Sequence, residues 1–212
     1  MERHSTITFQ ADRRTRARTA RADRAAATRA RVVAAAGPLF IRLGYLDTTT
    51  SALATAAGVA VQTLYLSFGS KIAVFAAVLA AAEPDPGDGW LDAVRAERDG
   101  RTALARHLAV AARMVERSYP LAATLRAAAA DPEPAQLLER THAATLAWHA
   151  RAVDELAEKP TFTDRISLQR ATEILAALCS PETYGLLVVA HGWTTADWQD
   201  WVTRHAAVDL FV

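Results

Sequence analysis

The sequence predicts an all-α fold, and three observations support this. Apolar residues recur three and four positions apart along most of the chain, which is the spacing of one helix face. Alanine, the strongest helix former, dominates the composition, and runs of β-branched residues are few. No segment alternates apolar and polar residues as a strand does. With 212 residues, 51% of them hydrophobic, the chain can form a small domain followed by a larger one.

Breaks in the helical pattern divide the chain into three parts. Residues 1–22 form an arginine-rich arm with too little apolar content to fold alone. Residues 23–82 form a first helical domain, and residues 83–212 form a second one. The segment 83–89, rich in Pro, Gly and Asp, is the clearest boundary between them.

The first domain opens with a helix predicted from near Asp23 to Leu43, in which Pro38 should cause a kink or a split. Segment 45–71 then has the pattern of a helix-turn-helix. A short helix around 53–57 has a small, apolar face, and Gly58 permits the left-handed turn that follows. A second short helix, around 61–68, must pack across the first. In DNA-binding proteins, the protruding second helix of such a hairpin enters the major groove.

The charges of this hairpin favour an anionic partner. Residues 48–82 contain no Asp or Glu, and four hydroxyl residues, 48–51, open the first short helix. The dipole of that helix is therefore free for an external anion. Lys71 opens the next helix, 70–82, where a cation opposes the helix dipole, and a bound phosphate would account for it. The alternative is a helical hairpin in an ordinary all-α domain with a solvated Lys71.

Several short motifs of this segment have the order and spacing of a known family. They are Thr49-Thr50, Leu53-Ala54, Ala57-Gly58-Val59, Thr63-Leu64-Tyr65, Phe68 and Ser70-Lys71. Over residues 25–82 the chain thereby resembles TetR-like (TetR/AcrR) transcriptional regulators. The resemblance implies a homodimeric repressor that binds double-stranded DNA at a pseudo-palindromic operator and responds to a small-molecule inducer, without a cofactor. The chain departs from the family pattern at Ala60, where a hydroxyl cap is usual, and at Leu66, where an aromatic or polar residue is frequent.

The resemblance also implies which residues contact DNA. Positions 61 and 62 would face bases, and most of the others would contact the DNA backbone. The expected DNA-binding residues are Thr49, Thr50, Ser51, Val61, Gln62, Thr63, Tyr65, Ser67 and Lys71.

The charge of the chain is unevenly distributed. Residues 1–82 have a net charge of +7 and residues 83–212 a net charge of −6, so the first part is the one that faces a polyanion. Six arginines precede the first predicted helix or lie at its start: Arg13, Arg14, Arg16, Arg18, Arg21 and Arg24. Such an arm could follow phosphates or enter a minor groove, or it could be a solubilising tail without specific contacts.

The second domain is predicted to be helical throughout. Its predicted helices cover residues 90–97, 100–118, 121–130, 135–158, 165–191 and 195–209. Prolines at 120, 132, 134 and 160 separate several of them. Pro181 is expected to kink the helix 165–191 rather than end it. Thr194 and Asp197 have the spacing of a capping box that opens the last helix.

Helix 135–158 carries two histidines, His142 and His149, on a face that should be buried. They can be core residues, line a ligand pocket or bind a metal, but a seven-residue spacing without a third ligand disfavours the metal. His107 could join them only through a tertiary contact. The resemblance implies an inducer cavity among these helices, for a small, mostly apolar or aromatic molecule with one or two polar groups. The candidate lining residues are His107, Met114, His142, Trp148 and His149.

The last two helices have more apolar surface than a small domain requires. The resemblance implies that they dimerise as a four-helix bundle, whereas the alternative is that they close the core of their own chain. The candidate interface residues are Leu175, Leu178, Tyr184, Trp198 and Trp201.

The sequence argues against an enzyme, a metal site and a membrane partner. It has no Gly-rich phosphate loop, no His-Glu-x-x-His, no Cys-x-x-Cys and no Gly-x-Ser-x-Gly. Its single cysteine, Cys179, excludes an internal disulfide, and its longest apolar run, 72–82, is too short for a bilayer. We therefore expect a cytoplasmic regulator. The alternative function is a helical ligand-binding or partner-binding protein whose hairpin has lost specific DNA binding.

Overall fold

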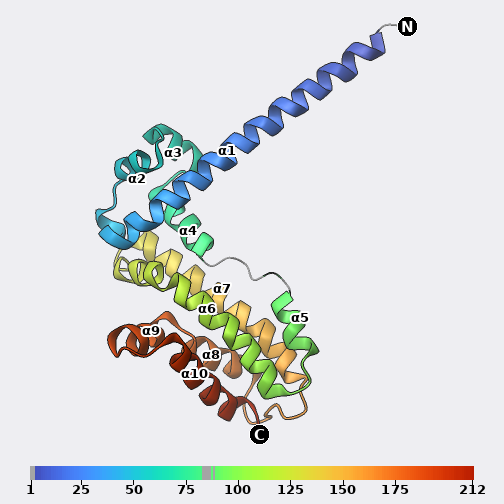
Figure 1. The fold of residues 1–212 in the computed structure, drawn as a ribbon, viewed down its shortest axis with the longest axis vertical. Coiled ribbons are helices and arrows are strands. Elements are labelled where there is room, and N and C mark those ends of the chain that lie inside the picture. The colour runs from blue at the N-terminus through green and yellow to red at the C-terminus, as the bar shows by residue number, and fades with distance from the viewer. Residues whose placement is uncertain (1–2, 83–86, 88) are drawn as a thin grey trace. The chain divides into compact units, whose positions relative to one another are not determined.

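The computed structural model describes residues 3–82, 87 and 89–212, with side chains from Thr19 onward. Within these ranges every regular element is a helix (Figure 1), which confirms the predicted all-α fold. A single isolated β-bridge joins Phe162 to Phe211. The chain divides into an N-terminal unit, Met1–Val78, and a C-terminal unit, Leu79–Val212.

The N-terminal unit contains the helices α1 (Arg3–Asp47), α2 (Thr50–Ala57), α3 (Val61–Phe68) and most of α4 (Lys71–Ala82). Its core forms where three aromatic rings meet. The Phe40 and Phe75 rings lie 4.8 Å apart edge to face, and Tyr45 contacts Phe75 at 5.7 Å. These contacts fix the end of α1 against α4, while the fully buried Leu53 and Leu64 anchor α2 and α3 in the same core.

Helix α1 differs from its prediction at two places. It begins at Arg3 rather than near Asp23, because Ala and Arg, both strong helix formers, dominate the segment that precedes Asp23. It also continues through Pro38, and its only non-helical residue is Gly44 (φ 79°). Pro38 has no backbone N–H to donate to the carbonyl of Ala34, four residues earlier. Both residues are exposed, so this carbonyl can accept a hydrogen bond from water instead. The predicted split at Pro38 is therefore wrong.

The C-terminal unit is built on two long helices that run side by side, α6 and α7 (Figure 1). Its elements are α5 (Gly89–Ala96), α6 (Gly100–Ala127), α7 (Pro132–Ala157), α8 (Leu168–Leu178), α9 (Pro181–Tyr184), the π-helix η1 (Gly185–Ala190) and α10 (Thr195–Leu210). Leu104, Leu156, Leu175 and Trp198 are fully buried, so all the long helices contribute to one core. The predicted boundary segment 83–89 lies outside the described residues except for Gly87 and Gly89.

Two prolines of this unit act differently from their predicted roles. Pro120 lies on the exposed side of α6, which stays one helix where two were predicted. Pro181, in contrast, begins a new helix: α8 ends at Leu178, and the Ser180 hydroxyl accepts a hydrogen bond from the backbone N–H of Thr183 at 3.2 Å. The predicted helix 165–191 is therefore three elements. The predicted capping box of Thr194 and Asp197 is confirmed.

By length and composition alone, the helical stretch Leu168–Ala190 could cross a membrane. Several features favour another explanation of its apolar surface. The stretch is interrupted by the cap at Ser180, and it includes the charged residues Arg170, Glu173 and Glu182. Only 17% of its most apolar window is buried within the chain, and the exposed large apolar residues of the stretch are Leu168, Leu186 and Val189.

Candidate functional site

Helices α2 and α3 form the predicted helix-turn-helix. Their axes are bent by 100° at the break between them, within the range of DNA-binding hairpins. Gly58 ends α2 in the left-handed conformation (φ 63°, ψ 40°), and the N–H of Val59 bonds the carbonyl of Ala54 at 3.0 Å. The turn therefore depends on a backbone conformation that glycine adopts without strain, as the sequence predicted.

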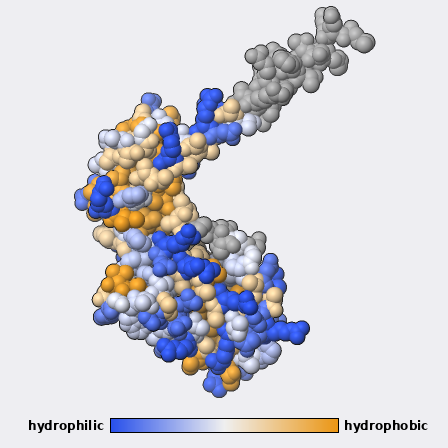
Figure 2. All heavy atoms as spheres, viewed as in Figure 1, coloured by the Kyte–Doolittle hydropathy of each residue, from blue (hydrophilic) through white to orange (hydrophobic). Residues whose placement is uncertain are grey.

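Helix α3 presents one exposed face and one packed face. Val61, Gln62, Tyr65 and Leu66 are exposed, and Leu66 is the most exposed large apolar residue described, at 82%. The packed face holds the buried Leu64 and the half-buried Phe68. Figure 2 shows apolar side chains at the surface of the unit that contains α2 and α3.

An arginine of α1 holds the end of α3. The guanidinium carbon of Arg29 lies 4.1 Å from the centre of the Phe68 ring, and its Nη1 donates to the carbonyl oxygen of Ser67. The Ser67 side chain is half-buried, as is that of Thr63 one turn earlier. These two expected DNA-binding residues therefore lie at the edge of the exposed face rather than at its centre.

The N-termini of α2 and α3 lack acidic residues in the first turn, so both can receive an anion. Thr49 caps α2, and its hydroxyl accepts from the N–H of Ala52 at 3.1 Å. Ala60 precedes α3 without a side-chain bond, which leaves the first amides of α3 for an external acceptor. Thr50 and Ser51 lie in the first turn of α2, and the Tyr65 hydroxyl is 3.5 Å from that of Thr50. A hydroxyl of α3 thus lies beside the hydroxyls at the N-terminus of α2.

Lys71 has a structural partner that the sequence did not reveal. Its Nζ donates to the carbonyl oxygens of Tyr45 at 2.9 Å and Leu46 at 3.3 Å, and it lies 4.3 Å from the centre of the Tyr45 ring. These carbonyls lie just after Gly44 interrupts α1, so the ammonium stabilises the helix end. Because an ammonium has three N–H donors, one remains for a phosphate.

Replacing Lys71 with alanine is expected to lower the free energy of unfolding by about 1–2 kcal/mol, because two charge-assisted hydrogen bonds are lost. If Lys71 also contacts a phosphate, the salt dependence of DNA binding should weaken by about one unit per protomer. Chemical denaturation and salt titrations of DNA binding measure the two effects. Lys159→Ala is the matched control, since Lys159 donates to the carbonyl of Arg95 at 2.8 Å in the C-terminal unit. An equal salt slope for Lys71→Ala and the wild type would leave Lys71 a purely structural role.

In the C-terminal unit, two of the predicted histidines form a buried pair. Nε2 of His107 on α6 and Nδ1 of His149 on α7 share a hydrogen bond of 2.9 Å, and both side chains are almost fully buried. Burial lowers the pKa of His149 from 6.5 to about 4. Burial and the charge of His149 lower the pKa of His107 well below its usual value. Both imidazoles are therefore neutral at pH 7.

Two tryptophans surround this pair, and only one of them was predicted. The Trp148 ring lies 4.4 Å from His107, and the Trp90 ring of α5 contacts both Trp148 at 4.7 Å and His107 at 5.3 Å. Three buried atoms of this His–Trp cluster have no hydrogen-bond partner among the described residues: Trp90 Nε1, Trp148 Nε1 and His107 Nδ1. Buried polar groups are normally paired, so the cluster has unused hydrogen-bonding capacity.

The other two predicted ligand residues lie elsewhere. Met114 is half-buried two turns after His107 on α6. His142 is exposed, and the prediction that it shares a buried face with His149 is wrong. Among the described residues, no group of three or more His, Cys, Asp or Glu side chains is placed to hold a metal ion.

The predicted dimer residues fall into two sets. Leu175, Tyr184 and Trp198 are buried within their own chain, so their predicted role at a subunit interface is corrected to a role in the core. Leu178 and Trp201 are half-buried. The exposed apolar residues Leu186 and Val189 were missed because the π-helix η1 does not follow the spacing expected of an α-helix. Trp193, in the loop after η1, was missed as well, and its ring lies 6.5 Å from that of Trp201.

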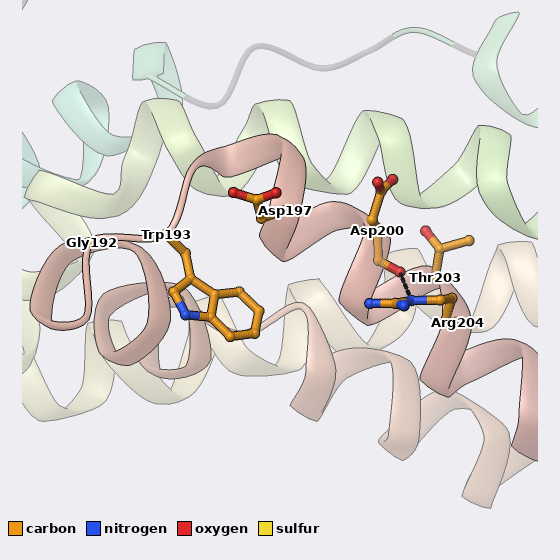
Figure 3. A pocket seen from close by; sticks show the side chains of 6 residues that line it. All are labelled: Gly192, Trp193, Asp197, Asp200, Thr203 and Arg204. Atoms are coloured by element: carbon orange, nitrogen blue, oxygen red, sulfur yellow. Dashed lines mark hydrogen bonds between the residues drawn. The ribbon is translucent and has the colours of Figure 1, made fainter.

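An open depression lies on α10 and the loop before it (Figure 3). It is lined by Gly192, Trp193, Asp197, Asp200, Thr203 and Arg204. Its charged groups are partly engaged: Asp197 forms the capping box, and Nε of Arg204 donates to the carbonyl of Asp200 at 3.4 Å. The single cysteine is not a reactive nucleophile at neutral pH, because burial raises the pKa of the Cys179 thiol to about 12.

Comparison with known proteins identifies the hairpin. Residues 32–78 match the family model of bacterial regulatory proteins of the tetR family. These residues form a DNA-binding segment of the tetR type. This TetR-family match covers the second half of α1, the helix-turn-helix and most of α4. It confirms the predicted DNA-binding regulator, and regulators of this family are transcription factors rather than enzymes.

Solved structures share the fold of this chain over most of its length. A putative TetR-family transcriptional regulator from Rhodococcus sp. is 21% identical, with a TM-score of 0.66 and coverage of 86% of this chain and 98% of that one. NalD of Pseudomonas aeruginosa, the secondary repressor of a multidrug efflux pump, is 16% identical, with a TM-score of 0.70 and coverage of 89% and 98%. FadR of Bacillus subtilis in complex with stearoyl-CoA is 16% identical, with a TM-score of 0.68 and coverage of 84% and 97%. No curated protein matches the chain.

Proposed function

We propose that this protein is a ligand-inducible TetR-family repressor that acts in the cytoplasm as a homodimer on a pseudo-palindromic operator. The observation that carries the proposal is the exposed face of α3, which crosses α2 at 100° in a segment without acidic residues. Such a face fits the major groove, and the acid-free surroundings fit the phosphates on either side.

Selection of bound sequences from a random DNA pool, followed by gel-shift titration, tests this proposal. We expect two inverted half-sites whose centres are about 34–36 Å apart, or a multiple of one helical turn. Gln62→Ala should alter the selected sequence, whereas Gln136→Ala, an exposed glutamine of α7, should not. A chain that binds every sequence equally would support the alternative, in which the hairpin has lost specific DNA binding.

The proposed dimer interface is the exposed apolar surface that begins on η1. Leu186 is 56% exposed and Val189 58% exposed, in a stretch with little burial within the chain. In a four-helix bundle these side chains would pack on their counterparts in a second copy. The half-buried Leu178 and Trp201 would flank this surface.

A charge at this surface should separate the protomers. Leu186→Glu would bury an unpaired carboxylate in the bundle, so we expect a folded monomer with greatly reduced operator affinity. Analytical ultracentrifugation and circular dichroism measure mass and folding. Val208→Glu is the control, because Val208 is 75% exposed on α10. A dimeric Leu186→Glu protein would place the interface on another face.

The proposed inducer site includes the His–Trp cluster. Its aromatic rings and unpaired polar atoms suit a small, mostly apolar or aromatic molecule that carries one or two hydrogen-bonding groups. The inducer would favour a dimer geometry in which the two α3 helices no longer match successive major grooves. Because α4 crosses the boundary between the two units, it is the covalent route for this coupling.

Coupling between inducer and operator must be reciprocal. A compound found by thermal-shift screening should therefore weaken operator binding, and the operator should weaken binding of the compound. His149→Ala should reduce both responses together. A compound that binds without changing operator affinity would show that its site is not regulatory.

The arginine-rich residues 1–22 are proposed to contact DNA phosphates beside the operator. Residues 3–22 form the start of α1 and continue directly into the domain that contains the hairpin. Deletion of residues 1–20 should then weaken binding to all sequences alike and reduce its salt dependence.

A further inference from the structure

The exposed face of α3 contains no charged residue. Its sequence, Val-Gln-Thr-Leu-Tyr-Leu-Ser-Phe, has no Arg or Lys, the usual partners of guanine, and no Asp or Glu, which can accept from cytosine. The side chains left to read bases are an amide, hydroxyls and apolar groups. Such groups pair best with adenine, through a bidentate amide, and with thymine, through its 5-methyl group.

The positions of the exposed side chains separate their roles. Tyr65 extends toward Thr50 at the N-terminus of α2, where its hydroxyl lies 3.5 Å from the threonine hydroxyl. Gln62 and Leu66 are one turn apart on the other flank of the exposed face. Four residues of helix advance about 6 Å, which is close to two base-pair steps of about 3.4 Å.

Packing within its own chain does not explain why residue 66 is an apolar leucine. It is 82% exposed, whereas Leu64 on the opposite side of α3 is fully buried. The surrounding unit has a strong positive charge and no acidic residue from Thr48 to Ala82, so DNA is the partner that its charge fits. A leucine presented to the major groove meets one apolar group there, the methyl of thymine.

We propose that Gln62 and Leu66 together recognise an A·T-rich step in each half-site. The Gln62 amide pairs with an adenine, and Leu66 packs on the 5-methyl group of a thymine one or two base pairs away. This inference rests on the proposed function, because it names the bases that the same helix reads.

Exchange of thymine for uracil in the selected operator tests the inference, because it removes only the methyl group. An exchange in one half-site should weaken wild-type binding about fourfold, the effect of about one buried CH₂-sized group, and exchanges in both half-sites about 15-fold. The Leu66→Ala protein should bind the thymine and uracil operators equally. Val208→Ala, at an exposed position of α10 outside the hairpin, should keep the wild-type sensitivity, and melting curves should show that both variants fold.

Three outcomes would overturn the inference. They are a selected half-site read only through G·C pairs, wild-type binding that no uracil exchange weakens, and a Leu66→Ala protein that keeps full sensitivity to the methyl group. These results leave the regulator proposal intact, because specific binding would still be measured. A chain without any sequence preference would overturn both proposals.

Discussion

Replacing Trp198 with alanine is expected to lower the free energy of unfolding of the C-terminal unit by about 3–5 kcal/mol. Trp198 is 1% exposed, and its ring meets that of Tyr184 edge to face at 5.1 Å. Loss of this ring would leave a cavity where α9 and α10 pack, together with the lost transfer free energy of the indole. Urea denaturation monitored by circular dichroism measures the change.

A second tryptophan variant shows whether the loss of stability comes from the burial of Trp198 or from the removal of any tryptophan side chain. Trp193 is 37% exposed in the loop before α10, so Trp193→Ala should change the free energy of unfolding by less than about 1 kcal/mol. If Trp198 instead contacted a partner chain, its effect would depend strongly on protein concentration. A concentration-independent loss is the result that fits its buried position.

Acid should destabilise the C-terminal unit through the His107–His149 pair. Burial lowers the pKa of His149 from 6.5 to about 4, so the unfolded chain binds this proton at a higher pH than the folded chain. The contribution of neutral His149 to stability is therefore complete above about pH 6.5 and decreases as the pH falls toward 4. A shift of this size corresponds to about 3 kcal/mol. The pKa of His107 is lowered as well and acts in the same direction.

The pH dependence can be assigned by substitution. His149→Phe removes the titrating group, and its unfolding free energy should change less between pH 7 and pH 4.5 than that of the wild type. His142→Phe, at an exposed position of the same helix, should keep the wild-type pH dependence. Equal pH dependence in all three proteins would show that the buried pair does not control acid stability.

The hairpin was predictable because its signals are local. Gly58 marks the turn by its conformational freedom, and the spacing of Leu53 and Leu64 places both in the core. The capping box of Thr194 and Asp197 is local in the same sense, since three residues specify it. Each of these features depends on neighbours within about one helical turn, which a sequence displays directly.

Several features that were missed depend on distant contacts. The partners of Lys71 are backbone carbonyls 25 and 26 residues away, which no side-chain pattern records. Trp90 joins the histidine pair only because α5 packs on α6 and α7. Pro38 and Pro120 remain inside helices, whereas Pro181 begins a helix that the Ser180 hydroxyl caps, a difference that the prolines themselves do not reveal.

The burial of Cys179 makes this chain convenient for fluorescence work. Its thiol is 3% exposed, and burial raises its pKa to about 12, so little thiolate exists at neutral pH to react with a maleimide. A second cysteine introduced at exposed Ser51 would be the preferred site of modification in the native protein. A dye attached there would report the arrival of DNA at α2 without removal of the natural cysteine from the core.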